Sequence, residues 1–332
     1  MERLPITRRD LGILVGVLSM ISPIGVAMSQ TLNVPNGVKP LTVSFSSGDG
    51  YVVGHLYLPV GYDATRRYPA VAIGGSFNSV KEQMGGIYGA ELARRGVMAL
   101  AIDYRNYGQS SGIMRQYEDA DSKADDLLAA LTFLKRRADV SGTGVLGICS
   151  SAGSVLYAAS KDHSVGAVAT VAGTFFKPSV TSLLYGADDG VAKKKEAGRK
   201  ARERFEKTGE LEFIPAHHYT DQTAANVGPM DYYMDSNRGG VPEWRNAVAV
   251  MSWANVLDFN SVEKAASVKS PTLIVHSDGS AFPDQARKVY DQLAGPKNLY
   301  WATGNHFDFY DQAPQVTDAA DRVAEHFKAT MK

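Results

Sequence analysis

The chain has little cysteine and no excess of either charge. Its 332 residues include one cysteine, Cys149, which excludes an intramolecular disulfide and a thiolate zinc site. The 35 basic residues equal the 35 acidic ones, so no overall positive field would hold nucleic acid or an anionic membrane. With 44% hydrophobic and 21% charged residues, the composition is that of a globular protein with one large core. No motif indicates a metal ion or an organic cofactor.

The first 29 residues have the pattern of an export signal. Arg8 and Arg9 precede an apolar run from Leu11 to Met28, and small residues precede a cleavage site after Ser29. This pattern resembles a bacterial twin-arginine signal, so we expect the export machinery to recognise residues 1–29 and the mature protein to be periplasmic or secreted, with no stable membrane partner. The alternative is a membrane anchor formed by residues 11–28, which are just long enough to span a bilayer.

Apolar runs then alternate with helical periods along the chain. Two β-strands separated by a turn open the pattern, and continuous apolar runs typical of strands buried on both faces follow. The expected strands are Leu41–Phe45, Val52–Leu58, Ala70–Gly74, Met98–Asp103, Gly144–Cys149, Val165–Val171, Thr272–Ser277 and Leu299–Thr303. The expected helices are Ile87–Arg95, Ala124–Arg137, Pro283–Leu293 and Gln315–Phe327. This order predicts an α/β fold with a doubly wound, mostly parallel eight-stranded sheet.

Residues 175–255 interrupt this alternation. They lose strand character, begin with a charged helix over Val191–Lys207 and then carry several aromatic residues. An insertion of this length is expected to fold over the strand ends as a helical lid. The core would then comprise residues 30–174 and 256–332, and the lid residues Tyr232, Tyr233 and Trp253 are candidates for a substrate pocket.

The most informative motif runs from Gly147 to Ser151. A buried strand enters a tight turn and then a helix, with small residues two positions before and after Cys149. Such a turn holds a nucleophile in a strained backbone conformation, and the helix N-terminus favours a thiolate. Cys149 is therefore the first candidate nucleophile. Ser151, flanked by Cys149 and Gly153, is the alternative, and a cysteine that only packs in the core is the third possibility.

A nucleophile of this kind needs a base and an acid that orients it. His306 follows the last expected strand directly, at the edge of the sheet where the nucleophile would lie. Asp278 ends the preceding strand and is the candidate acid; Asp284, in the first turn of the next helix, is the alternative.

Backbone amides are expected to bind the oxyanion of the reaction intermediate. One would come from Ser150, which follows the nucleophile, and one from the loop after the third strand, at Ser76 or Phe77.

The order nucleophile, acid, histidine, together with the strand–turn–helix motif, resembles the α/β-hydrolase family, and the cysteine is similar to that of its dienelactone-hydrolase-like branch. The segments 80–83, 103–112, 147–149 and 304–311 resemble bacterial hydrolases grouped with fungal polyketide transferases. The resemblance covers Leu41 to Phe327 and implies the fold far more strongly than the substrate.

These observations predict an exported hydrolase of a small-molecule carboxylic ester, lactone or thioester. Cys149 would form a covalent acyl-enzyme with the help of His306 and Asp278. One alternative is an acyltransferase of the polyketide-transferase type. The other is a ligand-binding protein that keeps the fold without catalysis.

Overall fold

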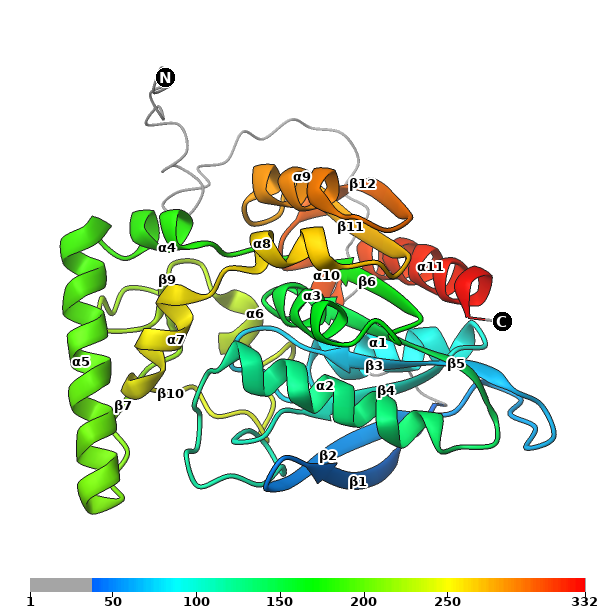
Figure 1. Cartoon of the computed structure of the whole chain (residues 1–332), viewed down its shortest axis with the longest axis horizontal. Coiled ribbons are helices and arrows are strands. Elements are labelled where there is room, and N and C mark those ends of the chain that lie inside the picture. The colour runs from blue at the N-terminus through cyan, green and yellow to red at the C-terminus, as the bar shows by residue number, and fades with distance from the viewer. Residues whose placement is uncertain (1–37, 332) are drawn as a thin grey trace.

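The computed structural model describes residues 38–331, which form one eight-stranded sheet with helices on both faces (Figure 1). The strands are β1 (Leu41–Ser47), β2 (Gly50–Tyr57), β3 (Tyr68–Gly74), β4 (Met98–Asp103), β5 (Val140–Ile148), β6 (Ala167–Val171), β11 (Thr272–Gly279) and β12 (Lys297–Asn305). Their spatial order is β1-β2-β4-β3-β5-β6-β11-β12. β1 pairs antiparallel with β2 and β2 antiparallel with β4, whereas all pairs from β4 to β12 are parallel. The predicted fold class is confirmed.

Successive residues of a strand point to opposite faces of the sheet, and helices pack against both faces. In β3, Val71 and Ile73 pack in one core with α1 (Met84–Arg94) and α11 (Ala313–Thr330). Their neighbours Ala70 and Ala72 pack in the other core, against α2 (Ala120–Lys135), α3 (Ser151–Lys161) and α9 (Pro283–Gln292). The central strands are therefore apolar throughout, as a parallel sheet covered on both faces requires.

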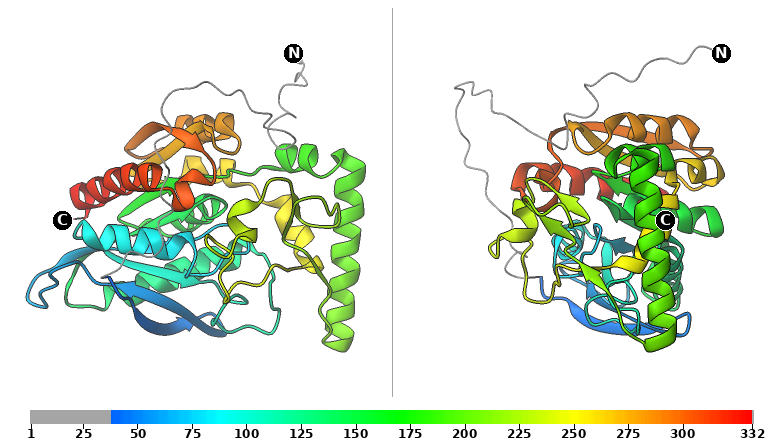
Figure 2. Two further views of the ribbon diagram at one scale, coloured as in Figure 1. Left: turned by 180° about the vertical axis from the view of Figure 1, so that it is seen from behind. Right: turned by 90° about the vertical axis from the view of Figure 1, so that its left-hand side faces the viewer.

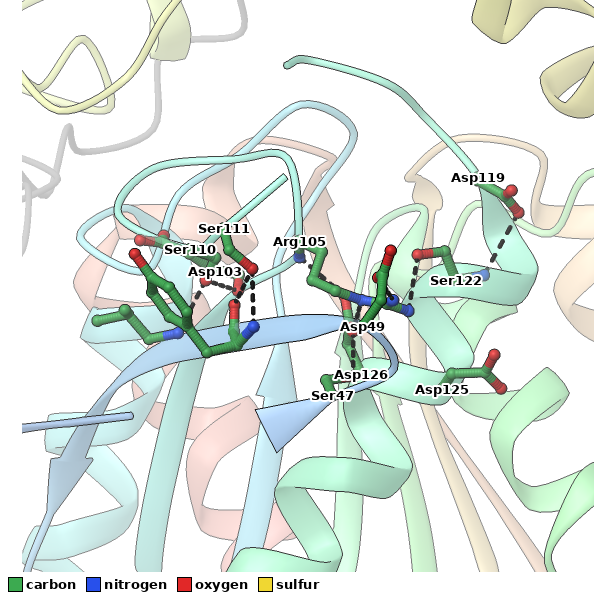
Figure 3. A network of polar contacts seen from close by, with 12 residues as sticks. Ser47, Asp49, Asp103, Arg105, Ser110, Ser111, Asp119, Ser122, Asp125 and Asp126 are labelled. Carbon is green, nitrogen blue, oxygen red and sulfur yellow. Dashed lines mark hydrogen bonds and ion pairs between the residues drawn. The ribbon is translucent and has the colours of Figure 1, made fainter. Parts of the chain in front are cut away.

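A buried carboxylate attaches the antiparallel edge to this core (Figure 3). Asp126 of α2 accepts hydrogen bonds from the Ser47 hydroxyl at the end of β1 and from the Arg105 backbone and guanidinium after β4. Asp119 caps α2 by accepting from the amides of Asp121 and Ser122. These contacts satisfy groups that would otherwise be buried without partners.

The inserted segment, residues 175–255, lies beside the sheet at the carboxyl ends of its strands (Figures 1 and 2). Its elements are α4 (Pro178–Leu184), α5 (Ala187–Thr208), β7 (Phe213–Ile214), β8 (His217–His218), β9 (Asn226–Val227), α6 (Asp231–Met234), β10 (Val248–Ala249) and the start of α7 (Trp253–Asp258). Between α7 and β11 lies α8 (Ser261–Lys264), and α10 (Asp308–Asp311) follows β12. The segment has its own small core, in which Trp253 and Leu257 pack with Ala201 and Val248.

The helix α5 stands at the outer edge of the molecule (Figure 2). Its charged side chains form surface ion pairs, such as Arg199 with Glu196 and Glu203. Such pairs are typical of a solvated helix face.

The expected export signal, residues 1–29, lies outside the described residues. Within residues 38–331, no helix is long and apolar enough to cross a bilayer.

Candidate active site

Cys149 lies at the turn between β5 and α3, in a strained backbone conformation. Its φ of +55° is in the left-handed region, which a residue with a side chain rarely adopts. The Cys149 amide donates to the Val171 carbonyl, and the Cys149 carbonyl accepts from the amides of Ala152 and Thr174. These three bonds fix the turn, so the half-buried sulphur projects at the N-terminal end of α3.

The turn requires a glycine at position 147, two residues before the cysteine. A Cβ atom on Gly147 would lie 2.3 Å from the Ser151 carbonyl oxygen and 2.7 Å from the Ala152 nitrogen. Strand and helix can therefore approach this closely only with glycine at this position.

The structure brings His306 to Cys149. The Nε2 atom of His306 lies 3.4 Å from Cys149 Sγ, and Thr174 Oγ1 lies 3.4 Å from the same sulphur on another side. His306 follows β12 directly, and its amide donates to the Gly279 carbonyl at the end of β11. Two adjacent strand ends thus hold the imidazole beside the thiol.

The imidazole of His306 is neutral and has a defined tautomer. Burial lowers its pKa to about 4. The Ala281 amide points at Nδ1, with 3.2 Å between the nitrogen atoms. An amide can only donate, so Nδ1 accepts and the proton of the neutral ring is on Nε2, facing the sulphur.

Asp278, the predicted acid, is not brought to His306. Its side chain is 79% exposed, and its carboxylate pairs with Arg287 of α9. The strand alternation explains this position, because the preceding Ser277 is buried and Asp278 points to solvent at the bulge between Ser277 and Gly279. The alternative, Asp284, is exposed in the first turn of α9. Neither carboxylate occupies the third position of a triad.

Ser151, the alternative nucleophile, is fully buried in the first turn of α3. Its hydroxyl donates to the Gly75 carbonyl and lies 2.8 Å from the Tyr104 hydroxyl. The geometry thus gives Ser151 a role in joining the turn to the loop after β3, away from His306.

The loop after β3, residues 75–79, is held by buried polar contacts. Among the described residues, the amides of Ser150, Ser76 and Phe77 donate none of the backbone hydrogen bonds that hold the surrounding turns. The next residue, Asn78, has its amide bound by Glu118 and its carbonyl bound by the Trp244 indole. Other groups therefore hold this loop in place. The amides expected to bind the oxyanion donate no backbone hydrogen bond among the described residues.

Lys81, two residues after this loop, forms a buried ion-pair cluster. Its buried ammonium lies 2.8 Å from Asp103 and 2.7 Å from Glu82. Glu82 is thus used in this ion-pair cluster and is not a residue of the site.

Two tyrosines complete the surroundings of the sulphur. Tyr310 of α10 lies four residues after His306, and its hydroxyl is 3.0 Å from His306 Nε2. The Tyr233 hydroxyl, from the inserted segment, donates to Ser76 Oγ over 2.6 Å. Tyr310 is not among the residues that the sequence predicts for the site; its spacing of four residues from His306 is the one signal for it in the sequence.

The three aromatic candidates for the pocket have different positions. Tyr233 contacts Ser76 and stacks on His217, Tyr232 is buried against Tyr310 and Arg238, and Trp253 belongs to the small core of the inserted segment. An apolar cavity opens instead beside Ser150, at the N-terminal ends of α2 and α3. Its walls are formed by Phe77, Ser150, Phe176, Val256 and Phe259, together with the buried Lys123–Glu118 ion pair.

No three His, Cys, Asp or Glu side chains between residues 38 and 331 are grouped as a metal site would need.

Comparisons with known proteins agree with this fold. No family model matches the chain. The crystal structure of hypothetical protein PA2218 from Pseudomonas aeruginosa superposes with a TM-score of 0.78 at 25% identity, covering 94% of this chain and 100% of that one. The α/β hydrolase GrgF from a Penicillium species superposes with a TM-score of 0.73 at 20% identity, over 88% and 98%. The acyltransferase drtE of Aspergillus calidoustus is 27% identical, over 73% of this chain and 80% of that protein.

The parallel sheet, the strained turn at its centre and the solved structures that superpose on it lead to one conclusion: the chain has the α/β-hydrolase fold.

Proposed function

We propose that the protein is an acyl-transferring hydrolase whose nucleophile is Cys149. The observation that carries this proposal is the half-buried sulphur at φ +55°, within hydrogen-bonding distance of a half-buried histidine whose pKa is lowered to about 4. Strained turns of this kind are costly, by about 1–3 kcal/mol, and are typical of reacting groups. The similarity to the acyltransferase drtE and to the α/β hydrolase GrgF supports hydrolase or acyltransferase activity in general terms.

The reaction has two steps. The Cys149 sulphur attacks the acyl carbonyl of an ester, lactone or thioester, an acyl–sulphur bond forms, and the bond to the departing alcohol or thiol breaks. The thiol proton ends on that leaving group. The amides of Ser150 and of Ser76 or Phe77 would bind the carbonyl oxygen as it becomes negative. In the second step, water or an acceptor alcohol, amine or thiol bonds to the acyl carbon and the acyl–sulphur bond breaks. The proton of the acceptor returns to the Cys149 sulphur.

The cavity beside Ser150 is the proposed site for the apolar part of the substrate. Phe77, Phe176, Val256 and Phe259 line it, and Ser150 connects it to the nucleophile turn.

Acyl transfer is the second candidate outcome. The fungal relative drtE, named as an acyltransferase, supports it. So does the missing carboxylate partner of His306 among the described residues, because activation of water needs a stronger base than attack by an amine or a thiol does.

We also propose that the protein is exported. Arg8 and Arg9 followed by the apolar run to Met28 support this proposal. Replacing both arginines with lysine should leave the protein in the cytoplasm, as cell fractionation would show; unchanged export would refute a twin-arginine signal.

Turnover of p-nitrophenyl butyrate tests the enzymatic proposal. The wild type should release p-nitrophenolate, and Cys149→Ala should release none above background. Full activity in Cys149→Ala would exclude Cys149 as the nucleophile. Asp278→Asn is the matched control, because its carboxylate is exposed and faces Arg287; this variant should retain activity.

A further inference from the structure

We propose that the Thr174 hydroxyl is a further catalytic group, which donates a hydrogen bond to the Cys149 sulphur and stabilises its thiolate form. Thr174 Oγ1 lies 3.4 Å from Cys149 Sγ. The importance of this bond for catalysis rests on the proposed function, in which Cys149 is the nucleophile. The bond itself can be tested by alkylation of the thiol, without turnover.

The surroundings of this hydroxyl leave the sulphur as its partner. Thr174 is buried, and among the described residues its hydroxyl has no other hydrogen-bond partner. A buried hydroxyl is costly to leave unpaired, so this one bonds to the sulphur. A thiolate has lone pairs and no proton, so the hydroxyl is the donor once Cys149 is ionised. A hydrogen bond to an ionised acceptor is roughly twice as strong as one between neutral groups.

The backbone of Thr174 is bonded to the same cysteine. Its amide donates to the Cys149 carbonyl over 2.9 Å, so two hydrogen bonds join the two residues. The Cys149 amide in turn donates to the carbonyl of Val171, the last residue of β6. These bonds fix the nucleophile turn and the loop after β6 relative to each other. A donor held this rigidly loses little entropy when it binds the thiolate.

The loop that carries Thr174 begins with a second strained residue. Ala172, directly after β6, has a φ of +45°, in the left-handed region. Its amide donates to the Val275 carbonyl of β11 over 3.0 Å, and His276 Nε2 lies 3.1 Å from the carbonyl oxygen of Gly173. Strained residues of this kind persist where the surrounding structure enforces them, and they are typical of active sites. Here the strained turn brings the Thr174 hydroxyl to the sulphur.

The titratable groups around the sulphur do not supply a positive charge in place of this donor. His306 Nε2 carries the ring proton, because the Ala281 amide donates to Nδ1, and burial lowers the pKa of this imidazole to about 4. The nearby phenols are Tyr310 of α10, whose hydroxyl contacts His306, and Tyr233 of the inserted segment, whose hydroxyl donates to Ser76. The thiolate therefore depends on uncharged donors and on the N-terminal end of α3.

The test is the pH dependence of Cys149 alkylation by iodoacetamide, followed by peptide mass spectrometry. Thr174→Val keeps the shape of the side chain and removes the hydroxyl. The pH of half-maximal rate should rise by about one unit, and the rate below that pH should fall about tenfold. Thr170→Val is the matched control, with an expected wild-type profile, because Thr170 is buried in β6 and its hydroxyl has no partner among the described residues. A Thr174→Val profile identical to wild type would overturn the proposal.

A second pair of variants separates the hydroxyl from the packing of the side chain. Thr174→Ser keeps the hydroxyl and loses the methyl group, whereas Thr174→Ala loses both. The serine variant should have the wild-type profile and the alanine variant the shifted one. Equal shifts in the two variants would contradict the proposal, because packing alone would then explain the effect.

Failure of this proposal and failure of the proposed function give different results. If the wild type is alkylated but never acylated by p-nitrophenyl butyrate, the enzymatic proposal fails while the hydrogen bond stands. If it is acylated and the alkylation profile is independent of the residue at position 174, only the hydrogen bond fails.

Discussion

Gly147→Ala is predicted to damage both stability and activity, by amounts that the structure allows us to estimate. The added Cβ would lie 2.3 Å from the Ser151 oxygen, 2.6 Å from the Ser151 carbonyl carbon and 2.7 Å from the Ala152 nitrogen. All three are backbone atoms of the first turn of α3, so no side-chain rotation relieves the contact. Overpacking costs about 1–3 kcal/mol, and we expect a value near 3 because α3 itself must shift.

The expected readouts follow from this estimate. At about 2 °C per kcal/mol for a large domain, the melting temperature should fall by roughly 6 °C. A shift of the turn also displaces the Cys149 sulphur and the Ser150 amide, and a misplacement of about 1 Å costs on the order of 100-fold in rate. Differential scanning calorimetry and ester turnover, both measured well below the melting temperature, give the two numbers.

Gly85→Ala in α1 is the matched control. Its Cβ would meet only Ala101 Cβ at 3.6 Å and Ile73 Cγ2 at 4.0 Å, which are ordinary contacts. Helix propensity favours alanine over glycine by at most about 1 kcal/mol, so this variant should be as stable as the wild type or slightly more so, with full activity. If Gly147→Ala behaved like Gly85→Ala, close approach of β5 and α3 would not be what positions the nucleophile.

Three further predictions can be tested with purified protein. Val256→Phe should fill the cavity beside Ser150 and raise KM for p-nitrophenyl butyrate about tenfold with little change in melting temperature; an unchanged KM would place the substrate elsewhere. Burial lowers the pKa of His217, His276 and His306 to about 3, 4 and 4, so the unfolded chain binds protons below about pH 6.5 that the folded chain does not. Each histidine should therefore subtract about 1.4 kcal/mol from the unfolding free energy between about pH 8 and pH 5.5. Burial raises the pKa of Asp126 and Glu82, which opposes this trend. The test is therefore the difference between wild type and His276→Gln in urea titrations at both pH values; an equal pH dependence would refute it. Finally, p-nitrophenolate release should show a burst of about one equivalent per chain, followed by a slower steady state that an added amine or thiol accelerates. Linear release, insensitive to acceptors, would indicate efficient hydrolysis instead.

The fold was predictable because its strands appear in the sequence as apolar runs and its helices as apolar residues spaced three and four apart. The run Met98–Asp103 is apolar at every position, and the structure buries β4 on both faces. The turn at Cys149 was recognisable because its geometry demands small neighbours, and Gly147 satisfies that demand. His306 was recognisable from its place after the last strand, which the parallel topology brings beside the end of β11.

The rest of the site depends on side-chain directions that a sequence pattern does not contain. Asp278 has the right place in the chain order, yet strand alternation turns it to solvent, where Arg287 binds it. Tyr310 contacts His306 Nε2 from α10, and bonds from Tyr88 and Arg238, both distant in the sequence, hold α10 in place. Trp253 was expected at the substrate, but the inserted segment needs it for its own core.

The central claim is that Cys149 carries the acyl group during turnover. Intact-mass spectrometry of protein quenched shortly after mixing with p-nitrophenyl butyrate, followed by peptide mapping, tests it most directly. We expect one butyryl group per chain, on the peptide at Cys149, absent in Cys149→Ala and after prior alkylation with iodoacetamide. A butyryl group on Ser151, or turnover with no acyl group on Cys149, would contradict it.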